Sequence, residues 1–292
     1  MNSDTINNIL VTIYMPTFNR LVLLKRAVSS VLRQSCSNIE LIIVDDGSTD
    51  GTIEYLRSVQ KMDDRVTMFK KDDFGGVKGA CASRNIAIKN ARGKYITGLD
   101  DDDYFLETHI ELLVQKWISC AGKIVAIYPD IYQIKGGKLR KRGLKVSRCT
   151  YEMLIYGNWI GNQIFTETSH LRAVDGFDEF FPAWQDLECW YRLLKKHNGY
   201  AVSLGHRTCV LDAEHSFERI SGKYDNVAQS FKMFVDKHKL TNFQSRALST
   251  QLSFYGSERP SLAALACKCL GLPRIFNFRN ALVIFYLSLT NN

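Results

Sequence analysis

Strand-like and helix-like segments alternate over residues 9–128 of this 292-residue chain, and this alternation limits the folds open to it. Apolar runs rich in β-branched residues indicate buried strands, and apolar residues at helical spacing indicate helices between them. The strand-like runs are residues 9–14, 39–44, 66–69, 95–99 and 124–128. This order predicts an α/β fold in which helices cover both faces of a mostly parallel central sheet.

Polar clusters follow three of these strands directly. They are residues 16–19 (PTFN), 45–48 (DDGS) and 100–103 (DDDD). Parallel strands end at the same edge of a sheet, and ligands in such folds bind beyond the carboxyl ends of the strands. We therefore expect the three clusters to lie together and to form a ligand site.

The four consecutive aspartates at 100–103 indicate a cation site. Adjacent carboxylates repel one another, and a divalent cation relieves that repulsion. Oxygen ligands suit Mg²⁺ or Mn²⁺, which use one or two carboxylates together with substrate phosphates. An EF-hand is excluded, because Phe105 occupies the position where that loop needs glycine. A solvated acidic loop that caps the next helix is the alternative interpretation.

The two aspartates Asp45 and Asp46 place carboxylates at the end of the second strand. A carboxylate at this position can accept a hydrogen bond from the N3–H of uracil, and the Gly-Ser backbone that follows allows close approach. The alternative is a plain turn that caps a helix, which Asp-Gly-Ser commonly forms.

The pattern is looser after residue 130. Residues 135–148 carry seven basic residues and no acidic one, and Gly136-Gly137 predicts a hairpin turn. The spacing predicts helices over 186–196, 225–239 and 243–255, and one or two apolar helices over 260–290 that break near Pro273.

Charge and cysteine content restrict the partners and the compartment. The net charge of +8 and the pI of about 9.0 favour an anionic partner: a nucleic acid, a phosphorylated substrate or an anionic membrane surface. The eight cysteines form no CxxC pair and the first residues lack a signal-peptide pattern, so we expect a cytosolic protein with reduced thiols and no structural zinc. The apolar run 281–289 is too short to cross a bilayer.

Four segments in a fixed order give the chain a family resemblance. They are VTIYMPTFNR, IELIIVDDGSTDGT, ASRNIAIKNARGKYITGLDDDD and GFDEFFPAWQDLECWYRL, which together span roughly residues 9–195. The chain resembles the family 2 glycosyltransferases, which have the GT-A fold. The resemblance implies a catalytic domain over 1–220, with nucleotide-sugar binding in 9–130 and the acceptor and catalytic part in 131–220. A helical, membrane-associating region over 221–292 would follow.

The resemblance also implies roles for individual residues. Asp46 would contact the uracil, with Asp45 as the neighbouring candidate, and Arg84 would face the nucleotide or its phosphates. Asp102, the last residue of an Asp-x-Asp motif, would bind Mn²⁺ or Mg²⁺, and His215 would lie near the metal or the diphosphate. The full set of implied substrate-binding residues is Pro16, Phe18, Asn19, Asp45, Asp46, Arg84, Asp100, Asp101 and Trp184. Trp184 as a core aromatic and His215 as a structural histidine are the alternatives.

The catalytic base implied by the resemblance is Asp186. It follows the segment 176–179 (GFDE), and Gln185 stands where the family more commonly has glutamate. We expect Asp186 to open a helix, where the N-terminal position lowers the pKa of a carboxylate. A simple helix cap is the alternative.

The function that the resemblance implies is inverting transfer of a sugar, a hexose or an N-acetylhexosamine, from a UDP-sugar to a glycan hydroxyl. The basic segment 135–148 and the apolar tail predict a peripheral protein on the inner face of the cell membrane. That location suits a lipid-diphosphate-linked acceptor in bacterial surface-polysaccharide (O-antigen, lipopolysaccharide) synthesis.

Other functional classes explain less of the sequence. A nucleotidyltransferase would show a glycine-rich loop after the first strand, and a dinucleotide-dependent oxidoreductase would show GxGxxG; neither motif is present. A non-enzymatic polyanion-binding protein would not place four aspartates at the ligand edge, so we expect no nucleic-acid partner.

Overall fold

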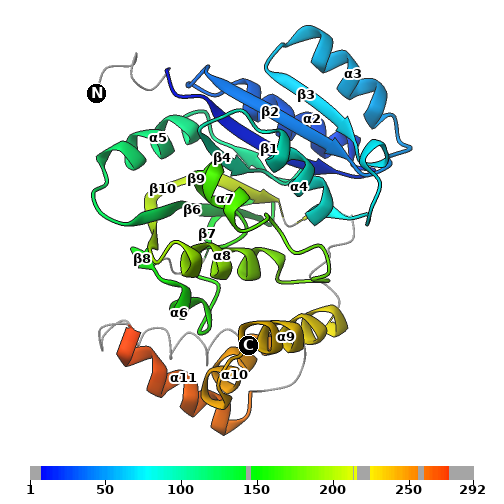
Figure 1. Cartoon of the computed structure of the whole chain (residues 1–292). Helices are drawn as coiled ribbons and strands as arrows, with labels where there is room; N and C mark the ends of the chain where they lie inside the picture. Colours follow the sequence, from blue (N-terminus) through cyan, green and yellow to red (C-terminus); the bar gives the residue numbers. More distant parts are fainter. Residues whose placement is uncertain (1–7, 143–145, 213, 216–223, 256–259, 276–292) are drawn as a thin grey trace.

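The computed structural model describes residues 8–142, 146–212, 214–215, 224–255 and 260–275. Figure 1 shows a central sheet with helices on both faces. The strands are β1 (Val11–Thr17), β2 (Ile39–Asp45), β3 (Val66–Lys70), β4 (Tyr95–Gly98), β5 (Tyr104–Phe105), β6 (Ile124–Lys135), β7 (Lys138–Arg142), β8 (Arg148–Cys149), β9 (Phe165–Glu167) and β10 (Tyr200–Asp212). The helices are α2 (Leu21–Leu32), α3 (Thr52–Met62), α4 (Ala80–Asn90), α5 (His109–Ser119), α6 (Tyr151–Leu154), α7 (Thr168–Ala173), α8 (Gln185–Lys196), α9 (Tyr224–His238), α10 (Asn242–Ser249) and α11 (Leu262–Ile275).

The sheet has the strand order β3-β2-β1-β4-β9-β6-β10-β5, with β7 beside β6 and β8 beside β10. Strands β3, β2, β1 and β4 are parallel to one another, as are β6 and β10. Strand β9 lies antiparallel between β4 and β6 and so joins the two parallel halves. The predicted α/β class and the mostly parallel sheet are therefore confirmed.

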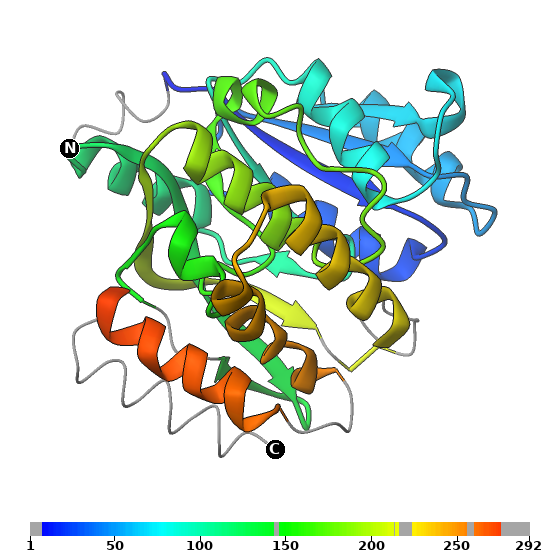
Figure 2. The ribbon, with the colours of Figure 1, turned by 60° about the horizontal axis from the view of Figure 1, so that its bottom comes forward.

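Alternate residues of β1 enter two separate cores. Val11, Ile13 and Met15 pack with α2, α3 and α5 on one face, whereas Tyr14 packs with α4 and α8 on the other. The second core continues into the helices after residue 220, through Phe234 of α9 among others. Figures 1 and 2 both show α9 beside α8. This core crosses the predicted domain boundary at residue 220. The division into domains there stays a prediction.

The carboxyl ends of β1, β2 and β4 lie at one edge of the sheet, as predicted. Pro16 is tolerated inside β1 because of where β4 ends. The carbonyl of Tyr14 accepts the N–H of Leu99, so Tyr14 bonds on the β4 side, and β4 ends at Gly98, opposite Tyr14. The missing N–H of Pro16 faces that same side, beyond the end of β4, so the proline removes no ladder hydrogen bond.

Several elements differ from the sequence prediction. Strands β5, β8, β9 and β10 were not predicted; β5, β8 and β9 have only two or three residues, and register shifts interrupt β10 opposite β6. The hairpin turn at Gly136-Gly137 is confirmed, and the Glu214 carboxylate accepts the N–H groups of both glycines. Helix α11 runs through Pro273 to Ile275, and the apolar run 281–289 lies outside the described residues.

None of the helices in the described part of the chain has the length and apolar character needed to cross a membrane.

Candidate functional site

The loops after β1 and β2 hold each other in place. The backbone N–H of Asn19 donates to Ser48 Oγ at 2.8 Å, and the N–H of Thr49 donates to Asn19 Oδ1 at 2.7 Å. Asn19 has a φ of 50°, a left-handed conformation that asparagine tolerates better than most residues. Its side chain therefore braces the two loops. Phe18, beside it, is 52% exposed at the sheet edge.

Asp45 and Asp46 have different surroundings. One oxygen of Asp45 accepts the N–H groups of Gly47 and Ser48, both at 3.0 Å, and so forms the turn after β2. Asp46 accepts the N–H of Gly79, just before α4, at 2.8 Å. The other oxygen of Asp46 is buried and has no hydrogen-bond partner among the described residues. Burial raises the pKa of Asp46, although the Gly79 N–H and two nearby lysines act in the opposite direction.

Asp101 points into the protein. The Thr17 hydroxyl donates to one of its oxygens at 2.8 Å and the Arg20 guanidinium donates to the other at 3.1 Å. Burial raises the pKa of Asp101 to about 6, with Arg20 and Thr17 lowering it and the neighbouring Asp102 raising it. Asp101 therefore ties the aspartate loop to the end of β1.

The other three aspartates form the acidic cluster, which we define as Asp100, Asp102 and Asp103. One carboxylate oxygen from each lies within 4.8 Å of the others. The Asp102 carboxylate contacts His215 Nε2 at 2.8 Å and Arg20 at 3.0 Å. Three carboxylate oxygens so close together suit a divalent cation with oxygen ligands. His215 thus lies against Asp102, and its role as a metal ligand stays a prediction.

Arg84, on α4, joins the acidic cluster to the start of α8. Its guanidinium donates to Asp100 at 2.8 Å and to Gln185 Oε1 at 3.3 Å. Burial lowers the pKa of Arg84, but the Asp100 carboxylate, together with Cys81 and Tyr14, raises it, so the net shift is upward and the side chain stays charged. Asn162 also donates to Asp100, at 3.2 Å.

Asn85, the residue after Arg84, holds residues 177–179, which lead to α8. Asn85 donates to the Phe177 carbonyl at 2.8 Å and to Glu179 at 2.9 Å, and it accepts the Phe177 N–H. A Cβ on Gly176 would lie 2.2 Å from Asn85 Oδ1, so this close approach requires glycine. Helix α4 therefore holds both sides of the site.

Asp186 lies in the first turn of α8. Asn158 donates to its Oδ2 at 2.9 Å. Burial raises the pKa of Asp186 and outweighs the nearby N–H groups and Arg84, which lower it. The N–H groups at the helix N-terminus lower this pKa as expected, but the expected net direction is wrong because burial outweighs them. A carboxylate with a raised pKa is a stronger base than an exposed aspartate.

Trp184 is only 7% exposed, and its ring meets Phe231 of α9 edge-on, with the centroids 6.4 Å apart. This places it in the core between α8 and α9. A role for Trp184 in acceptor binding has no support from this position.

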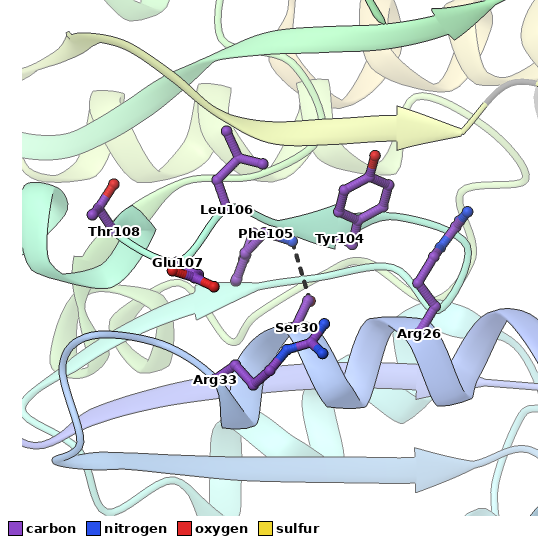
Figure 3. Close-up of a pocket in the computed structure, with 8 residues that line it drawn as sticks. All are labelled: Arg26, Ser30, Arg33, Tyr104, Phe105, Leu106, Glu107 and Thr108. Carbon is purple, nitrogen blue, oxygen red and sulfur yellow. Dashed lines mark hydrogen bonds between the residues drawn. The ribbon is translucent and has the colours of Figure 1, made fainter. Parts of the chain in front are cut away.

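A cavity of about 480 Å³ lies beside the acidic cluster, between α2 and the segment 104–108 (Figure 3). Arg26 lines it and also donates to the Asp102 carbonyl at 2.5 Å. Figure 3 shows Arg26 and Arg33 along α2, facing Tyr104 and Glu107. The aspartates of the cluster do not line this cavity, so it adjoins the site without forming it.

Three residues of the site received no individual role from the sequence: Arg20, Asp103 and Asn158. Arg20 follows the PTFN cluster and Asp103 ends the aspartate run, so both had a signal in their positions. Asn158 had none, because it reaches Asp186 from a loop 28 residues away.

Two substitutions in the aspartate run should have opposite consequences. Asp102→Asn removes a carboxylate of the acidic cluster, so we expect Mn²⁺ affinity to fall at least about tenfold, the loss of one charged contact. Asp101→Asn, the matched control, should leave Mn²⁺ affinity within about twofold, because its side chain faces Thr17 and Arg20. Isothermal titration calorimetry with Mn²⁺ measures both. Equal losses in the two variants would contradict the division of roles.

Comparison with known proteins identifies the family. Residues 12–180 match the model of glycosyl transferase family 2. WcaA of Escherichia coli strain K12, which is named for colanic acid biosynthesis, is 34% identical over 249 residues, covering 80% of this chain and 82% of WcaA. WfgD of E. coli, a UDP-Glc:alpha-D-GlcNAc-diphosphoundecaprenol beta-1,3-glucosyltransferase, is 28% identical over 196 residues, covering 67% of this chain and 74% of WfgD.

A solved structure shares the fold. The crystal structure of S. aureus TarS 1-349 in complex with UDP-GlcNAc superposes with a TM-score of 0.63 and 16% identity, covering 95% of this chain and 81% of TarS 1-349. The match confirms the GT-A-like fold. From the family model, the WcaA match and the shared fold, we conclude that this chain belongs to the family 2 glycosyltransferases.

Proposed function

We propose that this glycosyltransferase moves a hexose or an N-acetylhexosamine from a UDP-sugar to a hydroxyl of a lipid-diphosphate-linked glycan, with inversion at the anomeric carbon. The observation that carries the proposal is the position of Arg84. By contacting both Asp100 and Gln185, it sets the acidic cluster beside the helix turn that bears Asp186. A diphosphate leaving group and a base for the incoming hydroxyl then share one site.

Asp46 is the residue proposed to recognise uracil. Its second oxygen is buried without a partner among the described residues, and a buried acceptor of this kind favours a ligand donor such as the uracil N3–H. Asp45, which also has one buried oxygen without a partner among the described residues, completes the base pocket in this proposal together with the buried Pro16 and the exposed Phe18. The donor of WfgD is UDP-Glc, and TarS was crystallised with UDP-GlcNAc, which supports a uridine nucleotide here.

Asp100, Asp102 and Asp103 are the residues proposed to hold Mn²⁺ or Mg²⁺. The three carboxylate oxygens lie close enough together to bind one ion, and oxygen ligands are those that both ions prefer. When bound, the ion supplies positive charge that stabilises the departing diphosphate. His215 contacts Oδ2 of Asp102, as Arg20 does, and so helps to hold this carboxylate in place.

Asp186 is the proposed catalytic base. It takes the proton of the acceptor hydroxyl while the hydroxyl oxygen forms a bond to the anomeric carbon. The bond from that carbon to the diphosphate oxygen breaks with its electron pair, and UDP leaves from the opposite face. Asn158 fixes one carboxylate oxygen of Asp186, and burial gives the group the basicity that the step needs.

The acceptor and the location follow from charge and from the relatives. WfgD acts on a sugar linked to diphosphoundecaprenol. The hairpin of β6 and β7 presents Lys138, Arg140 and Lys141 to solvent, which suits an anionic membrane surface. We therefore place the protein at the cytoplasmic face of the membrane, as a peripheral enzyme of bacterial surface-polysaccharide synthesis.

A substrate panel tests the reaction. UDP-Glc, UDP-Gal, UDP-GlcNAc and UDP-GalNAc are each incubated with Mn²⁺ and a synthetic GlcNAc- or GalNAc-diphosphate-lipid, and UDP release is measured. We expect one donor to give a product of inverted anomeric configuration by NMR. Asp186→Asn should lower kcat by about 10²–10⁴, the usual contribution of a general base, and leave UDP affinity unchanged.

The acid limb of the same reaction reports on Asp186. Because burial raises its pKa, activity should fall as the pH drops through a value above the ordinary aspartate pKa of about 3.9. The matched control for Asp186→Asn is Asp175→Asn, which should keep wild-type turnover. Asp175 is an exposed aspartate with a φ of 59°, a conformation that asparagine also tolerates. Near-normal turnover by Asp186→Asn would refute the assignment of the base.

The proposed uracil contact predicts a change in base preference. Asp46→Asn keeps an oxygen for the Gly79 N–H but turns the second acceptor into an N–H donor. UDP affinity should fall by about tenfold or more, and CDP, whose N3 is an acceptor, should lose much less. Calorimetry of UDP and CDP binding with Mn²⁺ gives the ratio. An unchanged ratio would show that Asp46 does not contact the base.

Vesicle flotation at low salt tests the membrane location. The protein should float with phosphatidylglycerol vesicles and not with phosphatidylcholine vesicles. Lys138→Glu with Lys141→Glu should reduce flotation strongly, because each basic residue near an anionic surface contributes about 1 kcal/mol. Arg57→Glu with Lys61→Glu, on α3, makes the same change in net charge and serves as the control. Equal effects of the two pairs would exclude the hairpin as the docking surface.

A further inference from the structure

Helix α9 contacts the chain on both sides of Asp186. Both α8 and α9 begin after residue 180, where the match to the family model ends. In Figures 1 and 2 the two helices lie side by side.

Before Asp186, α9 binds the loop that leads into α8. The buried Ser230 hydroxyl accepts the backbone N–H of Ala183 at 2.9 Å. Phe231, the next residue, packs edge-on against the Trp184 ring. Two adjacent residues of α9 therefore hold the two residues that precede Gln185 and Asp186.

The backbone at Trp184 needs this support. Trp184 is the residue before α8 and has φ 54° and ψ 25°, the left-handed conformation that a bulky side chain rarely adopts. Its carbonyl accepts the N–H of Glu188 and so starts the helix. This turn sets the direction in which the first residues of α8, Asp186 included, enter the site. A backbone in a sparsely populated conformation persists only when its surroundings fix it.

After Asp186, α9 binds the buried Glu188. Lys237 Nζ lies 2.8 Å from a Glu188 oxygen and 2.5 Å from Asp178, and His238 Nε2 lies 3.2 Å from the same Glu188 oxygen. Burial alone would raise the pKa of Glu188, but the basic groups of His238, Arg192 and Lys237 beside it lower it to about 2. Glu188 is thus an ionised group with no exposure, held from both helices.

We infer that Ser230 and Lys237 are positioning residues that set the orientation of the Asp186 carboxylate, and that α9 belongs to the catalytic machinery. The inference rests on the proposed role of Asp186. Glu188 is two residues beyond Asp186, so on a helix the two side chains point to different faces. Asp186 contacts Asn158, and Glu188 contacts α9. Fixing Glu188 and the turn at Trp184 therefore fixes the rotation of α8 about its axis.

The main test uses Lys237→Met, with Lys232→Met, an exposed lysine of the same helix, as the matched control. Turnover is followed by UDP release with the donor and acceptor that give the fastest reaction in the panel above. Lys237→Met should lower kcat about tenfold to a hundredfold, the scale of a small misplacement of a reacting group, and leave KM for the donor within twofold. Lys232→Met should match the wild type. A lower melting temperature with unchanged kcat would mean that Lys237 only stabilises the fold, and would overturn the inference.

A double substitution separates this inference from the proposed function. In an Asp186→Asn background, Lys237→Met should cause no further loss, because the residue acts only through the missing carboxylate. If the losses of kcat in the two single variants multiply in the double variant, the positioning role is overturned and the assignment of the base stays intact. Near-normal turnover by Asp186→Asn alone would overturn both.

Hydrogen exchange gives a readout that needs no substrate. Ser230→Ala, a smaller change than Lys237→Met, should speed exchange of the backbone amides in 183–188 and leave residues 100–103 as in the wild type. The same pattern is expected for Lys237→Met. Unchanged exchange over 183–188 in both variants would show that α9 does not hold this turn.

Discussion

The Arg84 guanidinium is the contact on which the rest of the site depends. It pairs with Asp100 and at the same time holds Gln185, so one partly buried cation joins the carboxyl end of β4 to the start of α8. Because these segments are about eighty residues apart in sequence, no local interaction could bring them together. The same helix offers the Gly79 N–H to Asp46 at its beginning and Asn85 to Phe177 one residue after Arg84. Helix α4 therefore connects the nucleotide side, the acidic cluster and the base.

The acidic cluster is tolerated because positive groups surround it. Arg20 pairs with Asp101 and Asp102, Arg84 pairs with Asp100, and the Arg26 guanidinium donates to the Asp102 carbonyl. A carboxylate so close to its neighbours would otherwise favour its protonated form. The arginines reduce this repulsion but leave three carboxylate oxygens within 4.8 Å of one another. The site is thus built to accept further positive charge rather than to be neutral by itself.

Much of the fold could be predicted from the sequence, because the first half consists of regular strand and helix patterns. The run from β1 to α5 and the polar clusters at the sheet edge follow from periodicity and from the position of each cluster after its strand. Strand β9 could not be predicted, since three residues carry no periodic signal and its pairing with β4 and β6 depends on distant segments.

The site was predictable to a similar degree. Its aspartates and Arg84 lie in recognisable motifs, whereas the partners that orient them do not. Asn158 and Ser230 are ordinary loop and helix residues in the sequence, and only the fold shows that they contact Asp186 and the turn before it. The pKa of Asp186 is shifted upward, opposite to the predicted direction. The position at the helix N-terminus was visible in the sequence, but the burial was not.

The position of β9 has a consequence for how the chain acquires its structure during synthesis. Strands β1 to β4 come from the first hundred residues and can pair as soon as they emerge, but β4 then borders open solvent until residues 165–167 arrive to cover it. Over that interval the nascent chain carries an unpaired strand edge, the kind of surface at which β-rich polypeptides associate wrongly. Three residues in the middle of the chain thus close the edge that β4 would otherwise leave open.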